Sequence, residues 1–535
     1  MNDPSLIHGA IARQAAATPG AIAVVTRHER VSYAELDAAA DACAAELQYL
    51  GAGPGDLLPV LLPRSAQLVA VLLGVLKSGA GYAALDHRWP PDRIRGVLET
   101  LKPPLFITRE TVPGDLVPSW APPAEGPRWT ARRCPRPAPP ELTGDAPAAV
   151  FFTSGTSGAP KAVVSPHRAT TRLAPDATAW TGPGRTMVQA APVSWDAFSL
   201  ETWGPLITGG RCAMADGDFL LPAELRRLIS ARGADAVFLT TSLFNLLVDE
   251  DLDCFRGLRT VLTGGERMSL PHVRRCLTAH PRLALTNCYG PVESCVFVST
   301  QPVGAAECAT PGGVPLGAAV SATGVHILSG DRPVAPGTVG EICVSGQGLA
   351  LEYLGDPRLT AEKFPTVRVG GADTRVYRTG DRGLLDQNGV LHFRGRGDRQ
   401  VKIAGHRVEP QEIETVCRRI PGVRECAVAA LPDENGGGAR LALFYTVEPA
   451  EPAEPAEPAE PAEPVGSIEP AGAPGRRDLT PAALRRVLTE VLPHYLVPHF
   501  LSRQPAFPLT PNGKVDQAAL SALLTTPPVP ANRSL

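Results

Sequence analysis

The sequence lacks the features that mark several specialised classes of protein. Its 11 cysteines are scattered without a CxxC pair, a pattern that argues against both a disulfide framework and a zinc site. It has no apolar run of the roughly 18 residues that a membrane-spanning helix needs. Its first residues, MNDPSLIHGA, show neither the basic nor the apolar region of a signal peptide. The sequence therefore predicts a cytoplasmic protein without a membrane partner.

An excess of charge of one sign is also missing. The 535 residues include 51 Lys and Arg against 54 Asp and Glu, a net charge of −3, so we expect no basic surface for nucleic acid. An apolar content of 44% is typical of a well-packed globular protein. Because the chain is longer than one simple core accommodates, we expect two or more domains.

A loop rich in Ser, Thr and Gly follows a short apolar run in the stretch FFTSGTSGAPKAVV, residues 151–164. Its spacing does not match the GxxxxGK[ST] motif of P-loop proteins. Its hydroxyls and glycines let N–H and O–H groups converge on an anion, and Lys161 adds a point charge that suits phosphate. The alternative interpretation is a flexible turn between two strands.

Helix and strand patterns alternate to about residue 345, which predicts an α/β fold with mainly parallel sheets flanked by helices. Within this part, Ser32 and Glu35 have the spacing of a helix-capping box, and the apolar run at 68–85 predicts a buried helix followed by a Gly-rich turn and a strand. From about residue 373, short strands and Gly turns predict an antiparallel element that joins a small, mobile α+β domain at the C-terminus.

We place the large N-terminal domain at residues 1–397 and the small one at 398–522. Low-complexity sequence with Glu-Pro-Ala repeats occupies 448–475. Such repeats cannot form a packed core, so we expect a stiff, extended insertion within the small domain. The tail at 523–535 has the composition of a disordered segment.

Ten motifs follow one another from about Leu6 to Leu520, nearly the whole chain. They are VSYAEL (31–36), LKSGAGYAALD (76–86), TSGTSGAPK (153–161), WDAF (195–198), NCYGPVE (287–293), GEICVSGQGLALEYL (340–354), YRTGD (377–381), GRGDRQVKIAGHRVEPQEIE (395–414), LPHYLVP (492–498) and NGKVD (512–516). Together and in this order they resemble the adenylate-forming superfamily. Within it, the chain is most similar to a free-standing amino-acid adenylation domain of non-ribosomal peptide synthesis.

The resemblance implies that an amino-acid carboxylate attacks the α-phosphorus of ATP, that pyrophosphate leaves, and that aminoacyl-AMP forms. Because carboxylate and triphosphate repel each other, catalysis would depend on charge neutralisation and in-line positioning. In members of the family, the residues that match Lys161 and Glu293 bind the phosphates and Mg²⁺, and the match to Tyr289 stacks on adenine. The implied ATP-binding residues are Thr153, Ser154, Gly155, Thr156, Ser157, Gly158, Asn287, Tyr289, Gly290, Asp381 and Arg396.

Lys514, in the turn PNGKVD, matches the catalytic lysine that lies between the substrate carboxylate and the α-phosphate. Asp398 matches the family's hinge, about which the small domain rotates so that one site runs two half-reactions. In the second, the acyl group moves to the phosphopantetheine thiol of a carrier protein. Only about twenty residues follow Lys514, so we expect a separate carrier protein. A small activating protein is a further candidate partner.

Asp196 in SWDAF matches the acid that binds the substrate ammonium, since a buried carboxylate needs a cationic partner. We locate the family's other pocket positions in this chain by counting residues from the matched motifs. The residues there are mostly apolar and favour an apolar or aromatic substrate side chain. An α- or a β-amino acid is compatible, because a shifted amine could still reach the carboxylate. The implied substrate-binding residues are Asp196, Ala197, Leu200, Ser242, Leu262, Gly264, Cys288, Val296 and Phe297, closed by Lys514.

Two positions depart from the family pattern in ways that bear on function. Val292 stands beside Glu293 where a threonine is usual, which removes a hydroxyl near phosphate or metal-bound water and predicts altered ATP handling. Ala404 stands in VKIAG where an arginine is common, which predicts weaker contact with carrier or nucleotide.

Two other functions stay open. The first is a carboxylic acid–CoA ligase of the same superfamily, against which Asp196 argues. The second is a non-catalytic relative that acts as a binding or regulatory partner. Retention of Lys161, Glu293, Asp381 and Lys514 argues against it, because a protein released from catalysis has no physical need for all four.

Overall fold

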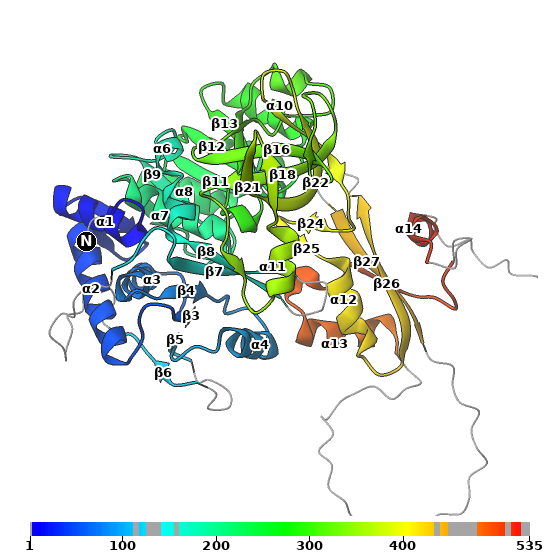
Figure 1. Cartoon of the computed structure of the whole chain (residues 1–535), viewed down its shortest axis with the longest axis horizontal. Helices are drawn as coiled ribbons and strands as arrows, with labels where there is room; N and C mark the ends of the chain where they lie inside the picture. The colour runs from blue at the N-terminus through cyan, green and yellow to red at the C-terminus, as the bar shows by residue number, and fades with distance from the viewer. Residues whose placement is uncertain are drawn as a thin grey trace, which may run out of the picture.

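The computed structural model describes residues 3–110, 117–124, 141–154, 160–432, 439–447, 479–508 and 515–525. The predicted insertion at 448–475 lies outside these residues. Figure 1 shows a large body, coloured blue to green, beside a smaller one coloured yellow to red. Within the described ranges no helix is both long and apolar enough to span a bilayer, and the ten cysteines found there are buried free thiols.

Two sheets with mainly parallel strands form the centre of the large body, as the alternating pattern predicts. In the described part of the chain, one sheet has the order β15-β14-β13-β12-β11-β9-β10-β1-β2 and the other β19-β8-β7-β4-β3-β5-β6. The strands are β1 (Ile22–Val25), β2 (Arg30–Ser32), β3 (Leu57–Leu61), β4 (Gly81–Ala84), β5 (Phe106–Thr108), β6 (Ser119–Trp120), β7 (Pro147–Thr153), β8 (Lys161–Pro166), β9 (Thr186–Gln189), β10 (Arg211–Met214), β11 (Ala236–Thr240), β12 (Thr260–Gly264), β13 (Ala284–Tyr289), β14 (Ser299–Pro302), β15 (Ala318–Ala319) and β19 (Glu352–Tyr353).

Helices flank both sheets. The predicted capping box opens α2: the Ser32 hydroxyl accepts the N–H of Glu35, and the Glu35 carboxylate accepts the N–H of Ser32 at 2.9 Å. Helix α3 packs against α2 and is buried along nearly its whole length, as its apolar sequence predicts. The helices of the large body are α1 (Ile7–Ala17), α2 (Tyr33–Tyr49), α3 (Ala66–Ser78), α4 (Pro91–Leu101), α5 (His167–Thr171), α6 (Ala174–Ala177), α7 (Asp196–Ile207), α8 (Pro222–Arg232), α9 (Thr241–Glu250), α10 (Leu270–Ala279) and α11 (Pro357–Lys363).

The antiparallel part of the chain begins earlier than predicted. Alternation to about residue 345 was expected, but β14 already pairs antiparallel with β13, and a sheet of order β17-β16-β18-β22-β23 starts at Thr323. The connections between its first strands are too short for a crossover helix, so these neighbours can pair only antiparallel. The strands are β16 (Thr323–Ser329), β17 (Arg332–Pro333), β18 (Gly340–Gly346), β22 (Tyr377–Leu385) and β23 (Leu391–Arg396), with a separate hairpin of β20 (Thr366–Val369) and β21 (Ala372–Arg375).

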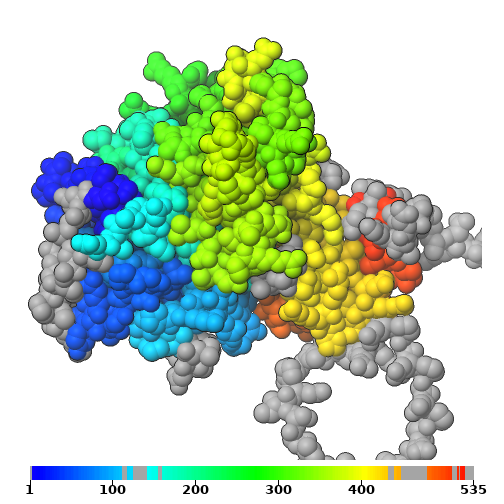
Figure 2. Space-filling view, in the orientation of Figure 1, coloured from blue at the N-terminus to red at the C-terminus, as the bar shows by residue number. Residues whose placement is uncertain are grey.

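The smaller body has its own apolar core and lies directly against the large one (Figure 2). Its sheet has the order β26-β27-β28, and a two-stranded hairpin, β24 with β25, projects toward the large body. Helix α14 includes residues 523–525, which were expected to belong to the tail. The elements are β24 (Val401–Ile403), β25 (His406–Val408), α12 (Pro410–Arg418), β26 (Val423–Pro432), β27 (Ala439–Val447), α13 (Pro481–Val491), β28 (Phe500–Arg503) and α14 (Gln517–Thr525).

Candidate functional site

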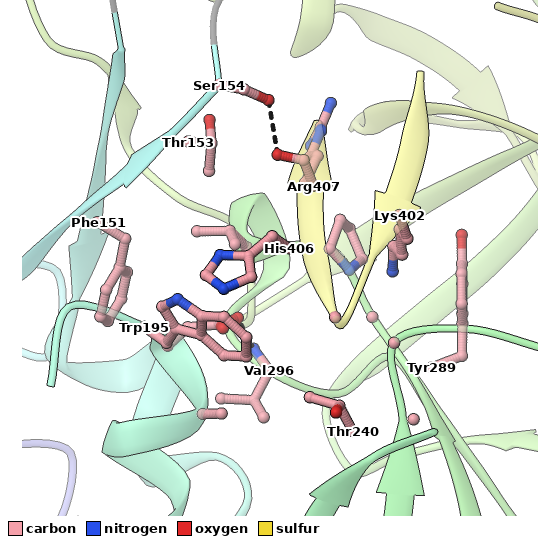
Figure 3. Close-up of a pocket in the computed structure, with 18 of the residues that line it drawn as sticks. Phe151, Thr153, Ser154, Trp195, Thr240, Tyr289, Val296, Lys402, His406 and Arg407 are labelled. Carbon is pink, nitrogen blue, oxygen red and sulfur yellow. Dashed lines mark hydrogen bonds between the residues drawn. The ribbon is translucent and has the colours of Figure 1, made fainter. Parts of the chain in front are cut away.

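The carboxyl ends of three parallel strands and the N-terminus of α7 meet around a cavity of about 140 Å³ (Figure 3). Thr240 ends β11, Gly264 ends β12 and Tyr289 ends β13. Thr153 and Ser154 reach the same cavity from the end of β7 in the second sheet. In α/β proteins ligands bind at this edge, because side chains from several strand ends converge there. This cavity is therefore the candidate functional site.

Asp196 is the first residue of α7 and contributes a buried carboxylate to the cavity wall. Its Oδ2 accepts the backbone N–H of Val296 at 2.9 Å. Burial raises the pKa of Asp196 above its ordinary value, and that hydrogen bond offsets part of the effect. Among the described residues no cation forms an ion pair with this carboxylate. The arrangement suits a ligand that brings a cationic group.

The remaining predicted substrate residues divide into two groups. Five of them line the cavity: Ala197, Gly264, Cys288, Val296 and Phe297. Three do not, and here the structure differs from the motif offset. Leu200 and Leu262 belong to the packed core behind the cavity, while Ser242 donates its hydroxyl to Glu266 at 2.6 Å.

Phe238, which was not predicted, lines the cavity, whereas Ser242 does not. Side chains alternate along a strand, so Phe238 and Thr240 of β11 face the same side, whereas Ser242 already lies in the first turn of α9. The Phe238 and Phe297 rings lie 5.8 Å apart between centroids and close the apolar end of the cavity. The two-residue period of the strand, counted back from Thr240, would have identified Phe238 from the sequence.

A second cavity of about 480 Å³ adjoins the first and shares part of its lining. Asn287, Tyr289, Asp381 and Arg396, all predicted to bind nucleotide, line it together. Tyr289 donates its hydroxyl to Asp381 at 2.5 Å, and Arg396 forms an ion pair with the other oxygen of the same carboxylate. The aromatic ring and the carboxylate therefore lie in contact, although 92 residues separate them in the chain.

Close backbone packing and an unsatisfied hydroxyl are found in the wall of the first cavity. A Cβ at Gly290 would lie 2.2 Å from the carbonyl oxygen of Val296, so only glycine fits there. The hydroxyl of Thr153 is buried and has no partner among the described residues, and Ser154 donates its hydroxyl to the Arg407 carbonyl at 2.8 Å (Figure 3). The rest of the predicted phosphate loop, Gly155, Thr156, Ser157 and Gly158, lies outside the described residues.

Glu293 and Lys161 each face a charged residue of the smaller body. The buried Glu293 carboxylate accepts from Arg407 Nη1 at 2.9 and 2.8 Å and from the Tyr353 hydroxyl at 2.7 Å. Burial alone would raise the pKa of Glu293, but the Arg407 guanidinium and the Tyr353 hydroxyl bring it below its ordinary value. The Lys161 ammonium lies 3.8 Å from the Glu409 carboxylate. Val292, beside Glu293, lines the first cavity.

The turn of the β24–β25 hairpin covers the first cavity (Figure 3). Gly405 at this turn donates its N–H to Glu266 at 2.9 Å. His406 stacks on Tyr495 with 3.7 Å between ring centroids and meets Trp195 edge-on at 4.4 Å. These hairpin contacts, and the Arg407–Glu293 pair, were not predicted from the sequence. Ala404 is exposed, with a left-handed φ of 49°.

Lys514 lies outside the described residues. Its neighbour Val515 packs with Phe507 and Leu520 against β26 and β27, and α14 lies on the side of these strands that faces away from the large body (Figure 1). Asp398, the predicted hinge, lies in the connection between β23 and β24. It forms an ion pair at 2.8 Å with Arg396, the last residue of β23.

Comparison with known proteins assigns this arrangement to a family. The sequence profile of the AMP-binding enzymes matches residues 11–354, and the profile of the C-terminal domain of AMP-binding enzymes matches residues 412–514. The chain belongs to the AMP-binding enzymes. The predicted superfamily, its adenylate-forming fold with a large and a smaller domain, and the enzyme class of ATP-dependent adenylating ligases are thereby confirmed.

The curated relatives of this AMP-binding enzyme include proteins named for the synthesis of peptides. It is 34% identical to the dimodular nonribosomal peptide synthase of Bacillus subtilis over 95% of this chain and 21% of that protein. It is 32% identical to tyrocidine synthase 3 of Brevibacillus parabrevis over 95% of this chain and 7% of that protein. The chain therefore spans a small part of the curated relatives that it matches.

Solved structures show the same fold. PA1221, an NRPS protein containing adenylation and PCP domains, is 34% identical, with a TM-score of 0.83 over 96% of this chain and 84% of that one. NpsA-ThdA, an artificially fused adenylation–PCP di-domain from Klebsiella oxytoca, has a TM-score of 0.82 over 93% of each chain. At 24% identity, the second likeness supports the fold alone.

Proposed function

We propose that this AMP-binding enzyme activates an amino acid as aminoacyl-AMP and releases pyrophosphate. The observation that supports the proposal is the Asp196 carboxylate, which is buried in the cavity wall without an ion-pair partner among the described residues. A buried carboxylate without an ion-pair partner is disfavoured. Lys402 and two backbone N–H groups offset the effect of burial on the Asp196 pKa only in part, so a substrate ammonium would stabilise the carboxylate. A plain fatty or aryl acid brings no such group.

The groups around the second cavity, together with Thr153 at the first, fit ATP. The Asp381 carboxylate would accept the ribose hydroxyls, with Arg396 as a further ribose contact, and the Tyr289 ring would stack on adenine. The buried, unsatisfied hydroxyl of Thr153 would donate to a phosphate oxygen, with Lys161 as a counter-charge at the start of β8. We propose these roles for the residues that the family resemblance assigned to nucleotide.

Glu293 fits Mg²⁺ by its chemistry, since this hard cation prefers carboxylate oxygens and takes its other ligands from water and phosphate. Within the described ranges no group of three His, Cys, Asp or Glu could hold a metal on its own. When bound, the ion would neutralise charge on the triphosphate. In the present orientation Arg407 provides the counter-charge of Glu293, so we propose that this ion pair separates when the metal–nucleotide complex binds.

The position of the hairpin supports a second half-reaction. The hairpin turn covers the cavity while Val515, next to Lys514, packs on the opposite side of the small sheet. We propose that this is the orientation for transfer to the phosphopantetheine thiol of a carrier protein, and that the reaction takes place in the cytoplasm. Rotation at Asp398, where residues 1–397 and 398–522 would meet, would bring Lys514 to the cavity for adenylation. A small activating protein stays a candidate partner.

The apolar end of the cavity favours an amino acid with an apolar side chain, and Phe238 sets its depth. We expect Phe238→Ala to shift the preference toward larger side chains, by about 10-fold or more in relative kcat/KM, because one or two methylenes of pocket space change discrimination by roughly this factor. The measurement is kcat/KM for a series from alanine to tryptophan. Ser242→Ala is the matched control, and an equal shift in that variant would contradict the placement of Phe238 in the wall.

Product analysis separates this function from its alternative, a carboxylic acid–CoA ligase. The purified chain is incubated with ATP, Mg²⁺ and either CoA or a phosphopantetheine-loaded carrier protein, and acids with and without an amine are compared by mass spectrometry. We expect aminoacyl-AMP and an aminoacyl carrier protein. Acyl-CoA from an amine-free acid would show that the alternative is correct.

A further inference from the structure

Arg172 is a buried cation that follows α5 and binds backbone rather than a carboxylate. It is 5% exposed, and no acidic residue among those described pairs with it. Its Nη2 donates to the carbonyl oxygens of Ser294 at 2.7 Å and Phe297 at 2.6 Å. Burial lowers the pKa of Arg172 to about 10. Burying a guanidinium costs free energy unless its N–H groups are hydrogen-bonded. The hydrogen bonds of Arg172 to backbone carbonyls therefore indicate a structural role at this place in the fold.

The segment that Arg172 holds has an unusual backbone. Cys295 and Val296 adopt φ values of +47° and +65° in succession, the left-handed region that residues with a side chain, and β-branched ones above all, rarely adopt. Such a conformation persists only where its surroundings fix it. Arg172 Nη2 binds the carbonyls of Ser294 and Phe297, on either side of this pair, and at 3.4 Å also the carbonyl of Cys295 within it. The guanidinium therefore holds the kink at both ends.

The kink in turn forms the substrate side of the cavity. Val296 and Phe297 line the cavity, and the N–H of Val296 donates to Asp196 Oδ2 at 2.9 Å. A continuous series of contacts therefore runs from the Arg172 guanidinium through the strained backbone to the carboxylate that we assign to the substrate ammonium.

Gly348 packs directly against the Arg172 guanidinium. A Cβ at Gly348 would lie 2.4 Å from both Nε and Nη2 of Arg172, closer than any side-chain carbon can approach. The loop after β18 therefore leaves room for the guanidinium only because residue 348 is a glycine. Replacing Gly348 offers a way to displace the guanidinium without changing Arg172 itself.

We propose that Arg172 is a positioning residue for substrate selection: it holds the 294–297 kink so that Val296 orients the Asp196 carboxylate toward the substrate ammonium. This inference rests on the proposed amino-acid activation and adds a determinant that does not touch the substrate. It implies that loss of the clamp changes amino-acid recognition and leaves the nucleotide side of the site intact.

The test measures amino-acid and ATP dependence separately in Arg172→Lys and Gly348→Ala. Lysine keeps the charge but loses the planar guanidinium, whose Nη1 binds the Ala169 carbonyl while Nη2 binds the carbonyls of the kink. In Gly348→Ala the added methyl pushes the guanidinium away. In both variants we expect the amino-acid KM in pyrophosphate exchange to rise about 10- to 100-fold, the range for loss of charged hydrogen bonds. The ATP KM and the affinity for AMP should stay within about twofold of the wild type.

Arg168→Lys is the matched control, since Arg168 lies in α5, one turn before Arg172, and donates to the carbonyls of Gln347 and Leu349 but does not contact the kink. Its amino-acid KM should remain at the wild-type value. A wild-type amino-acid KM in either Arg172→Lys or Gly348→Ala, with AMP binding retained, would overturn the positioning role. A wild-type enzyme without any amino-acid-dependent exchange would instead overturn the proposed function, and with it this inference.

Discussion

Asp196→Asn is expected to reduce kcat/KM for amino-acid-dependent ATP–pyrophosphate exchange by about 10²- to 10³-fold, the cost of breaking a buried ion pair. Asparagine keeps the volume of the side chain and an oxygen that accepts the Val296 N–H, which lies 2.9 Å from the carboxylate. The substitution removes the negative charge and replaces the other acceptor oxygen by an NH₂ donor, so it abolishes the attraction between the carboxylate and the substrate ammonium. Initial rates of exchange at varied amino-acid concentration give the measurement.

Asp176→Asn provides the control for this substitution. Asp176 in α6 also accepts one backbone N–H, that of Ser321 at 3.0 Å, and it does not line the cavity. Its exchange rate should stay within about twofold of the wild type, and both variants should bind AMP normally. Undiminished exchange in Asp196→Asn would show that the carboxylate does not bind the ammonium.

Gly405→Ala is expected to slow transfer to the carrier protein by about 10- to 100-fold while exchange continues near the wild-type rate. Gly405 has a φ of +85°, and a Cβ there would lie 2.4 Å from Cγ2 of Thr240. The methyl therefore opposes the contact between the hairpin and the large body, in addition to a backbone cost of about 1–2 kcal/mol. Adenylation would proceed in the other orientation, where the hairpin leaves the cavity.

The matched control is Gly389→Ala, because Gly389 has a similar φ of +77° but no atom within 4 Å of an added Cβ. It carries the backbone strain without the clash, and carrier loading should remain within a few-fold of the wild type. Single-turnover loading, started from preformed aminoacyl-AMP, separates the second half-reaction from the first. Equal loading by Gly405→Ala and the wild type would mean that the observed orientation is not the one that transfers the acyl group.

Local sequence signals predicted much of the fold. The capping box at Ser32 and the buried run of α3 each depend on residues close in sequence, and both are present. The start of the antiparallel sheet at Thr323 was misplaced because strand direction depends on which strands pair, and a periodic pattern contains no information on pairing. Whether a segment forms a helix or a strand therefore depends here on nearby residues, whereas the sheet that a strand joins does not.

The candidate site divides in the same way. Asp196 and Tyr289, each singled out from a motif, both line the first cavity, and their roles there stay predictions. Ser242 does not line the cavity. It lies in the first turn of α9, beyond the end of β11, so the alternation of side chains along the strand no longer decides where it points. The contacts of Arg407 and Gly405 depend on how one domain sits against the other, a geometry that no local pattern encodes.

The most direct measurement is ATP–pyrophosphate exchange with matched pairs of acids, each apolar α- or β-amino acid beside its amine-free analogue, and with Lys514→Ala alongside. We predict strong exchange with an apolar amino acid, little with its analogue, and a loss of about 10²- to 10³-fold in Lys514→Ala. Exchange supported equally by the amine-free acids would contradict the assignment of the buried Asp196 carboxylate as the ammonium site, and with it the activation of amino acids.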